Sequence, residues 1–167
     1  TVETIGYYAF VNCGFTSITL PKTLKDLGDT AFANSKITSI TLPSGLTEIK
    51  FDLFSNCHEL TTVNLPNTIT VIGRTVFWRC EKLTTINIPN SVTKIEHHAF
   101  YGCTGLTSIK IPDSVTCIET HAFSHCYNLT SIEIPGSIKS IEYHAFYRCY
   151  NLSESVNSNM IIKDSIM

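Results

Sequence analysis

Apolar positions in this sequence follow a block of about 23 residues rather than one sustained helix or strand period. In the block from 106 to 128, the alternation over residues 109–111 predicts a short strand with one buried face. Pro112 has a fixed φ and no N–H, so it ends that strand in a turn. Residues 115–118 then predict a second extended stretch, and residues 121–126 predict one turn of 3₁₀ or α helix.

The block repeats along nearly the whole chain. A phenylalanine, here called the repeat Phe, recurs at intervals of 22 or 23 residues. It stands at Phe10, Phe32, Phe54, Phe77, Phe100, Phe123 and Phe146. All six prolines recur in the same way. One block is too small to close a core, but stacked blocks bury a continuous apolar column. The sequence therefore predicts a solenoid of about seven 22–23-residue units over residues 1–152, beginning inside a unit.

The pattern L-x-x-I-x-I-P-x-x-V-x-x-I-x-x-x-A-F-x-x-C resembles the Treponema-type, or BspA-like, leucine-rich repeats. The resemblance implies a curved stack with a parallel sheet of short strands on its concave face and short extended, 3₁₀ or helical segments elsewhere. It also implies a cell-surface or secreted protein that acts in adhesion and host-protein binding. The chain departs from the pattern in its 22-residue early units and in Ser35, which replaces the repeated Cys.

The C-terminal residues 153–167 lose the pattern. They are expected to form an irregular cap or a remnant tail, with residues 160–162 folded over the last core layer. The opposite end is expected to be exposed, because the chain begins inside a unit. An uncovered end leaves an unpaired strand edge, which predicts self-association at uncapped ends.

Composition narrows the function classes. The chain has 43% hydrophobic and 16% charged residues, which is too apolar for disorder. Its formal charge of -2 gives no electrostatic drive towards nucleic acid. No apolar run is long enough for membrane insertion. Motifs such as GxSxG, the P-loop and HExxH are missing, so no enzyme activity and no cofactor is expected.

The outward residue in the middle of each first strand forms a column across the units. We call it the strand face, and it consists of Thr19, Thr41, Asn64, Asn87, Lys110 and Glu133. Two neighbouring columns hold only Thr and Ser. One interpretation is a solvated sheet face, since Thr suits strands. The other is a binding surface for a protein, such as a matrix or host surface protein, or for a glycan. The leading hypothesis is thus a non-catalytic binding or adhesion module. The alternative is a structural spacer or assembly unit of a larger surface protein.

Six of the seven cysteines lie three residues after the repeat Phe. That column lies in the buried phase, so free packed thiols are expected rather than disulfides or metal ligands. Cys117 alone lies outside it, in a column of solvent-facing composition. It is therefore expected to be the one reactive thiol.

Histidines and aromatic residues gather in the later units. His98, His121 and His144 share one column, and Glu96, Glu119 and Glu142 share another. If this stretch is extended, the six side chains face the same way with imidazoles about 5 Å apart. This donor set suits zinc or nickel. An exposed edge without metal is the simpler interpretation, and no metal site is assigned. The aromatic residues Trp78, Tyr101, Tyr127, Tyr147 and Tyr150 either grip a partner or pack against the next unit.

Overall fold

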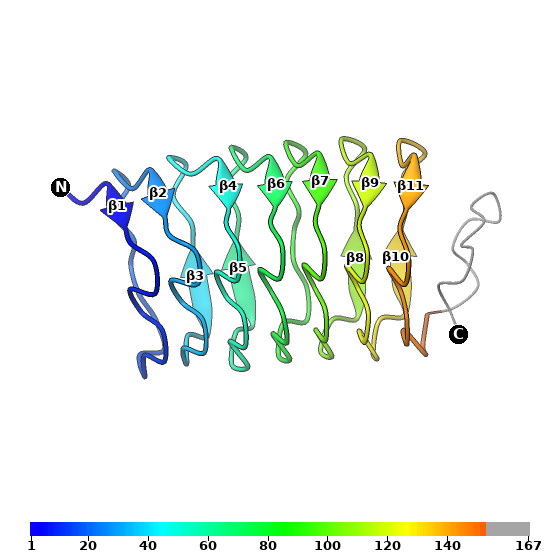
Figure 1. Cartoon of the computed structure of the whole chain (residues 1–167), viewed down its shortest axis with the longest axis horizontal. Coiled ribbons are helices and arrows are strands. Elements are labelled where there is room, and N and C mark those ends of the chain that lie inside the picture. The colour runs from blue at the N-terminus through cyan, green and yellow to red at the C-terminus, as the bar shows by residue number, and fades with distance from the viewer. Residues whose placement is uncertain (153–167) are drawn as a thin grey trace.

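The computed structural model describes residues 1–152, and these form a parallel β-solenoid in which each unit lies beside the next (Figure 1). The predicted fold class is confirmed. Two rows of short strands run the length of the stack on different sides of it. The expected cap and the residues 160–162 lie outside the described part of the chain.

The first row of strands follows the proline turns and carries the longest sheet. Its members are β1 (Thr4–Ile5), β2 (Asp26–Leu27), β4 (Glu48–Ile49), β6 (Val71–Ile72), β7 (Lys94–Ile95), β9 (Cys117–Ile118) and β11 (Ser140–Ile141). Strands β4, β6, β7, β9 and β11 form one parallel sheet, while β1 pairs with β2. The pairing places isoleucine beside isoleucine from Ile49 to Ile141. The predicted second extended stretch is confirmed, and its register forms one wall of the core.

The second row precedes the prolines and carries the predicted strand face. It contains β3 (Ser39–Thr41), β5 (Thr62–Asn64), β8 (Ser108–Lys110) and β10 (Ser131–Glu133). In each strand the middle residue is buried and its neighbours are exposed. The row is interrupted, because residues 85–87 form no strand and the sheets β3–β5 and β8–β10 are separate. Asn64 and Asn87 occupy the outward position at this break, and strands disfavour asparagine.

The segment around each repeat Phe is not helical, which corrects the helical turn expected over 121–126. Its N–H groups alternate between two kinds of partner. In the fifth unit, Ala99, Tyr101 and Cys103 donate to the carbonyl three residues earlier, at 3.1–3.2 Å. The alternating N–H groups of His98, Phe100 and Gly102 donate to backbone carbonyls of the sixth unit, at 2.8–3.1 Å. A helix would use all of these donors internally, so the bonds between units replace it.

Two residues per unit make this alternation possible by adopting a left-handed backbone. They lie two residues before and two residues after the repeat Phe, with φ between 55° and 69°. Except at Tyr8 and Thr75, each is the third residue of a hydrogen-bonded four-residue turn, the position at which a type II turn requires positive φ. Asn12, Asn34, Asn56 and Gly102 are the residue types that accept this conformation most easily.

The repeat Phe rings form the centre of the core. Neighbouring rings lie 5.1–5.7 Å apart and within 21° of parallel, from Phe10 to Phe146. Five cysteines are buried beside them and are free, as expected. Each of these thiols donates to the carbonyl of the repeat Phe one unit earlier, at 3.1–3.2 Å. The cysteine column therefore joins adjacent units as well as filling space.

Replacing Phe100 by Ala should reduce the free energy of unfolding by about 3–5 kcal/mol, because a cavity opens between two neighbouring rings. Its ring is fully buried and lies 5.2 Å from Phe77 and 5.1 Å from Phe123. The half-buried Phe10 stacks on one repeat Phe only, so Phe10→Ala should cost less. Denaturant melts of the two variants measure this, and equal losses would contradict a linear stack.

At Thr75, as at Thr30, the turn conformation and the residue type conflict. The φ of Thr75 is 55°, although β-branched residues rarely adopt that region. Within residues 1–152, its hydroxyl is also the only buried polar side-chain atom without a partner. Thr75→Asn should therefore raise the free energy of unfolding by about 1 kcal/mol. Thr116→Asn, at an exposed position without positive φ, is the control and should change little. A loss of stability in Thr75→Asn would contradict this account.

Candidate functional site

All six strand-face residues are exposed along one side of the stack. Four of them belong to β3, β5, β8 and β10, while Thr19 and Asn87 lie outside named strands. Asn64 donates a side-chain hydrogen bond to the Thr41 hydroxyl at 3.1 Å. Lys110 and Glu133 form an ion pair at 3.3 Å, but both side chains are more than two-thirds exposed. Such a pair contributes little to stability, which leaves both groups available to a ligand.

Three shallow depressions follow the strand face from the first unit to the sixth, and together we call them the strand-face groove. The first holds about 600 Å³ and includes Thr19, Thr41 and Asn64 in its wall. The second holds about 390 Å³ and includes Asn87. The third holds about 520 Å³ and includes Lys110 and Glu133. Asn90 lines both the second and the third.

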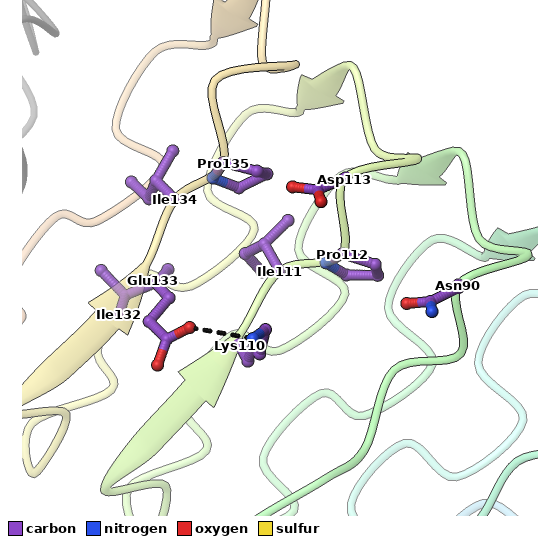
Figure 2. A pocket seen from close by; sticks show the side chains of 9 residues that line it. All are labelled: Asn90, Lys110, Ile111, Pro112, Asp113, Ile132, Glu133, Ile134 and Pro135. Atoms are coloured by element: carbon purple, nitrogen blue, oxygen red, sulfur yellow. Dashed lines mark ion pairs between the residues drawn. The ribbon is translucent and has the colours of Figure 1, made fainter.

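The third depression shows how the groove is built (Figure 2). Its floor is formed by isoleucines and by the prolines that end two successive strands. The charged pair Lys110–Glu133 and the carboxylate of Asp113 stand at its edges. Because the prolines recur in every unit, the same apolar floor with a variable polar edge recurs along the groove.

The hydroxyl column next to the strand face has a structural role. The side chains of Thr38, Thr61 and Thr130 donate to the backbone carbonyl of the equivalent residue one unit earlier, at 2.9–3.1 Å. The backbone N–H of each of these threonines donates to the same carbonyl, so the hydroxyls add a second bond between the units. The outward residues of the strand face are therefore better placed than this column to contact a partner.

A second surface lies where the turns of the fourth to seventh units meet. We call it the aromatic–imidazole flank. It consists of Trp78, His98, Tyr101, His121, His125, Tyr127, Tyr143, His144, Tyr147 and Tyr150. Trp78 and Tyr101 stack at 4.1 Å, and His144 lies between Tyr143 at 3.7 Å and Tyr147 at 4.6 Å. The interpretation that these aromatic residues pack against the next unit is confirmed, while their contact with a partner stays a prediction.

The histidine column has the expected spacing but not the expected backbone. Ring centroids of His98 and His121 are 4.9 Å apart, and those of His121 and His144 are 5.1 Å apart. All three residues are left-handed rather than extended. The carboxylates of Glu96 and Glu119 instead accept backbone N–H groups one unit earlier, from Arg74 and His97 at 3.1 Å. The described part of the chain contains no group of three or more side chains arranged to hold a metal ion.

Burial is the main reason why the pKa values of His98, His121 and His125 are lowered. Neighbouring positive groups add to the effect on each pKa: His121 on His98, His144 on His121, and Arg148 on His125. The neutral imidazoles therefore stabilise the flank, whereas their charged forms oppose it.

One hydrogen bond in the flank has the partners of a catalytic dyad. His121 Nδ1 lies 2.9 Å from the Ser124 hydroxyl. That hydroxyl is fully buried and donates to the carbonyl of His144 at 2.6 Å. Its proton is therefore used in the fold, and it accepts a hydrogen bond from the imidazole rather than being activated by it. This contact holds the sixth and seventh units together.

The family follows from the repeat together with this architecture. The model of the BspA type leucine rich repeat region matches residues 1–104 and 70–165, with six copies. The chain belongs to the BspA-type leucine-rich repeat family. No helix that could span a bilayer occurs within residues 1–152.

Solved structures of leucine-rich repeat proteins resemble this one. The leucine rich repeat protein of Treponema pallidum is 31% identical, with a TM-score of 0.87, covering 92% of this chain and 72% of that one. The protein from Bacteroides ovatus is 27% identical, with a TM-score of 0.75 and coverages of 91% and 45%. A leucine rich cell surface protein of Faecalibacterium prausnitzii is 29% identical, with a TM-score of 0.57 and coverages of 91% and 50%. No curated protein matches the chain.

The two left-handed columns are the feature of this BspA-type chain that sequence analysis missed. Asn and Gly recur two residues after the repeat Phe, at Asn12, Asn34, Asn56 and Gly102, and this recurrence was the available signal. The other column holds Tyr, Thr, Asp and His, none of which marks such a turn alone. Ser124 was missed as well, because no other unit places Ser there beside a histidine.

The accessible thiols should number two rather than one. Cys117 is half-buried and accepts a hydrogen bond from Ser140, and Cys13 is also half-buried. This corrects the expectation that Cys117 alone is accessible. Mass-mapped alkylation of the folded protein should label Cys13 and Cys117 and leave the five buried thiols unmodified. For the buried Cys80 and Cys103, desolvation also raises the pKa, which slows reaction further. Labelling of Cys80 equal to that of Cys117 would contradict the assignment.

Acid should destabilise the fold through the flank. The lowered pKa values mean that the folded state binds fewer protons than the unfolded chain, where histidine titrates near about 6.5. The contribution of the neutral imidazoles to the free energy of unfolding is therefore fully present above the pKa of the unfolded chain. It is lost as the pH falls through the lower pKa of the folded state. The midpoint temperature of unfolding should be lower at about pH 5 than at about pH 7.5. It should fall less in His98→Asn/His121→Asn, since Asn accepts the left-handed backbone. An equal drop in both proteins would place the acid sensitivity elsewhere.

Proposed function

We propose that this chain is a non-catalytic protein-binding module that contacts its partner through the strand-face groove. The observation that carries the proposal is the placement of all six strand-face residues on exposed positions along three depressions, of which the second and third share Asn90. An interface needs an apolar centre and a polar edge. The groove supplies both, with isoleucine and proline below and hydroxyl, amide and charged groups around them.

The side-chain chemistry of the groove changes along its length. Thr19, Thr41, Asn64 and Asn87 are neutral, whereas Lys110 and Glu133 are charged. A partner would therefore be held mainly by hydrogen bonds and apolar contact at the first four units, and would be oriented by charge at the last two. This supports recognition of a folded protein surface, for which a long graded contact provides specificity.

We infer a cell-surface or secreted location and an adhesive role towards host or matrix proteins. The location is supported by the leucine rich cell surface protein of Faecalibacterium prausnitzii, which is 29% identical and of which this chain spans half. A structural spacer is the second candidate function. It is favoured by the continuous hydrogen bonds between units, which make the stack a rod suited to holding other domains apart.

A charge placed in the groove should separate the two functions. Thr41→Arg introduces a long cation at the centre of the first depression, and it should weaken binding to a captured matrix protein at least about tenfold. Thr47→Arg makes the same change at an exposed position before β4, on the other row of strands, and should leave binding unchanged. Surface plasmon resonance against a panel of extracellular-matrix proteins measures this. Equal binding by the two variants would remove the groove from the proposal, and no binding to any protein would favour the spacer.

A further inference from the structure

The aromatic–imidazole flank carries a charge pattern that the proposed function does not use. Its turns comprise residues 75–81, 98–104, 121–127 and 144–150. These four windows contain two guanidinium groups, Arg79 and Arg148, against one carboxylate, Glu81. They also contain four imidazoles, each of which adds a positive charge when protonated. The flank is therefore nearly neutral at neutral pH and strongly cationic in acid.

Three carboxylates in or beside these turns are already paired, and a fourth, Glu142, is exposed and forms no ion pair within residues 1–152. Glu119 binds Lys94 at 2.7 Å and His97 at 3.1 Å. Glu96 binds Lys94 at 3.2 Å and caps the Arg74 N–H. Glu81 contacts His58 at 3.4 Å and Arg79 at 3.6 Å.

The other charged or titratable groups that face the imidazoles mostly repel their protons. Arg74 and His97 act on His98, Arg148 acts on His125, and the Tyr143 ring packs against His121 and His144. Protonation would thus place several unpaired positive charges about 5 Å apart. An external anion lying across the row would relieve that repulsion.

We propose that the flank is a binding site for an anionic polysaccharide, which docks along the imidazole row under weakly acidic conditions. The positive charge of the protonated flank favours an anion, and the spacing of its imidazole rings favours a polysaccharide. Imidazole neighbours are 4.9 and 5.1 Å apart, close to the advance of one pyranose unit along a glycan chain. Acidic side chains on one face of an extended peptide repeat at about 6.6–6.8 Å and fall out of register.

The flank also contains a depression beside the imidazole row that could hold a sugar ring. This depression of about 350 Å³ is lined by aromatic and polar residues, namely Trp78, Arg79, Glu81, Tyr101, Gly102, Thr104, His125 and Tyr127. The Glu81 carboxylate lies 3.6 Å from the Arg79 guanidinium. Aromatic groups and a few polar groups in one hollow are typical of small-ligand sites. His125 Nδ1 lies 2.7 Å from the Tyr127 hydroxyl, so this imidazole is held in place beside the hollow.

Linkage sets the size of the pH effect. An anion that raises the pKa of one bound imidazole by about one unit tightens its own binding about tenfold between the neutral and the protonated protein. Several imidazoles acting together should give more. This proposal does not rest on the strand-face groove. The groove follows the second row of strands, whereas the flank lies on the turns, and no histidine lines the three depressions of the groove.

The test measures binding of sulfated dextran to the full chain at about pH 5.5 and about pH 7.5, with neutral dextran and poly-glutamate as further probes. We expect binding of sulfated dextran at the lower pH, at least about tenfold weaker binding at the higher pH, and no binding of neutral dextran. His98→Asn/His121→Asn should lose most of the acid-dependent binding. Lys110→Gln, which removes a cation from the strand face, is the matched control and should retain it.

Three results would overturn the proposal: binding independent of pH, equal acid-dependent binding by the double variant, or binding of poly-glutamate as tight as that of sulfated dextran. A second measurement needs no variant. In NMR titrations of the unmodified protein, sulfated dextran should raise the pKa of His98 and His121, and neutral dextran should leave both unchanged. An unchanged pKa at His98 and His121 would overturn the proposal even if the double variant does not fold.

Discussion

The structure depends on the hydrogen bonds that each turn segment directs to the next unit. Half of the N–H groups around each repeat Phe close turns within the unit, and the other half bind the carbonyls of the following one. The second set cannot be formed by a unit alone, because its N–H groups would then have no carbonyl partner from the following unit. Stability therefore resides in the contacts between units, as expected of a solenoid. The stacked Phe rings, and the thiols and threonine hydroxyls that donate to the preceding unit, add further contacts between units.

This division of bonds also explains why the two surfaces differ. The strand face lies where ladders are short and the side chains point outward, so its residues vary without cost to the core. The flank lies at the left-handed turns, where side chains such as His98 and His121 stack on side chains of the adjacent unit. Substitutions there change both the surface and the fold. The histidines illustrate this, because their stacking stabilises the neutral form and makes the surface sensitive to acid.

Much of the fold could be predicted because the repeat consists largely of residues with strong preferences for a particular backbone conformation or for burial. Proline ends each first strand, alternation marks the buried face, and the 23-residue interval places Phe on Phe. The turn segment could not be predicted as readily, because an apolar Ala-Phe pair flanked by polar residues suits a helical turn as well as overlapping turns. What decides between them is the bond to the next unit, which is a property of the stack rather than of the segment. The strand break at residues 85–87 has the same origin, since Thr85-Ile86-Asn87 alternates like the strands on either side.

Hydrogen exchange of the backbone amides tests the central claim most directly, because the two kinds of N–H group can be read separately. The amides of Phe54, Phe77 and Phe100 donate to the following unit at 2.8–2.9 Å. If contacts between units hold the fold, these amides should exchange only on global unfolding and rank among the most protected. The equivalent amide of Phe10, in a half-buried unit, should exchange faster through fraying. Protection confined to the bonds within units, with rapid exchange at the three central Phe amides, would contradict the account.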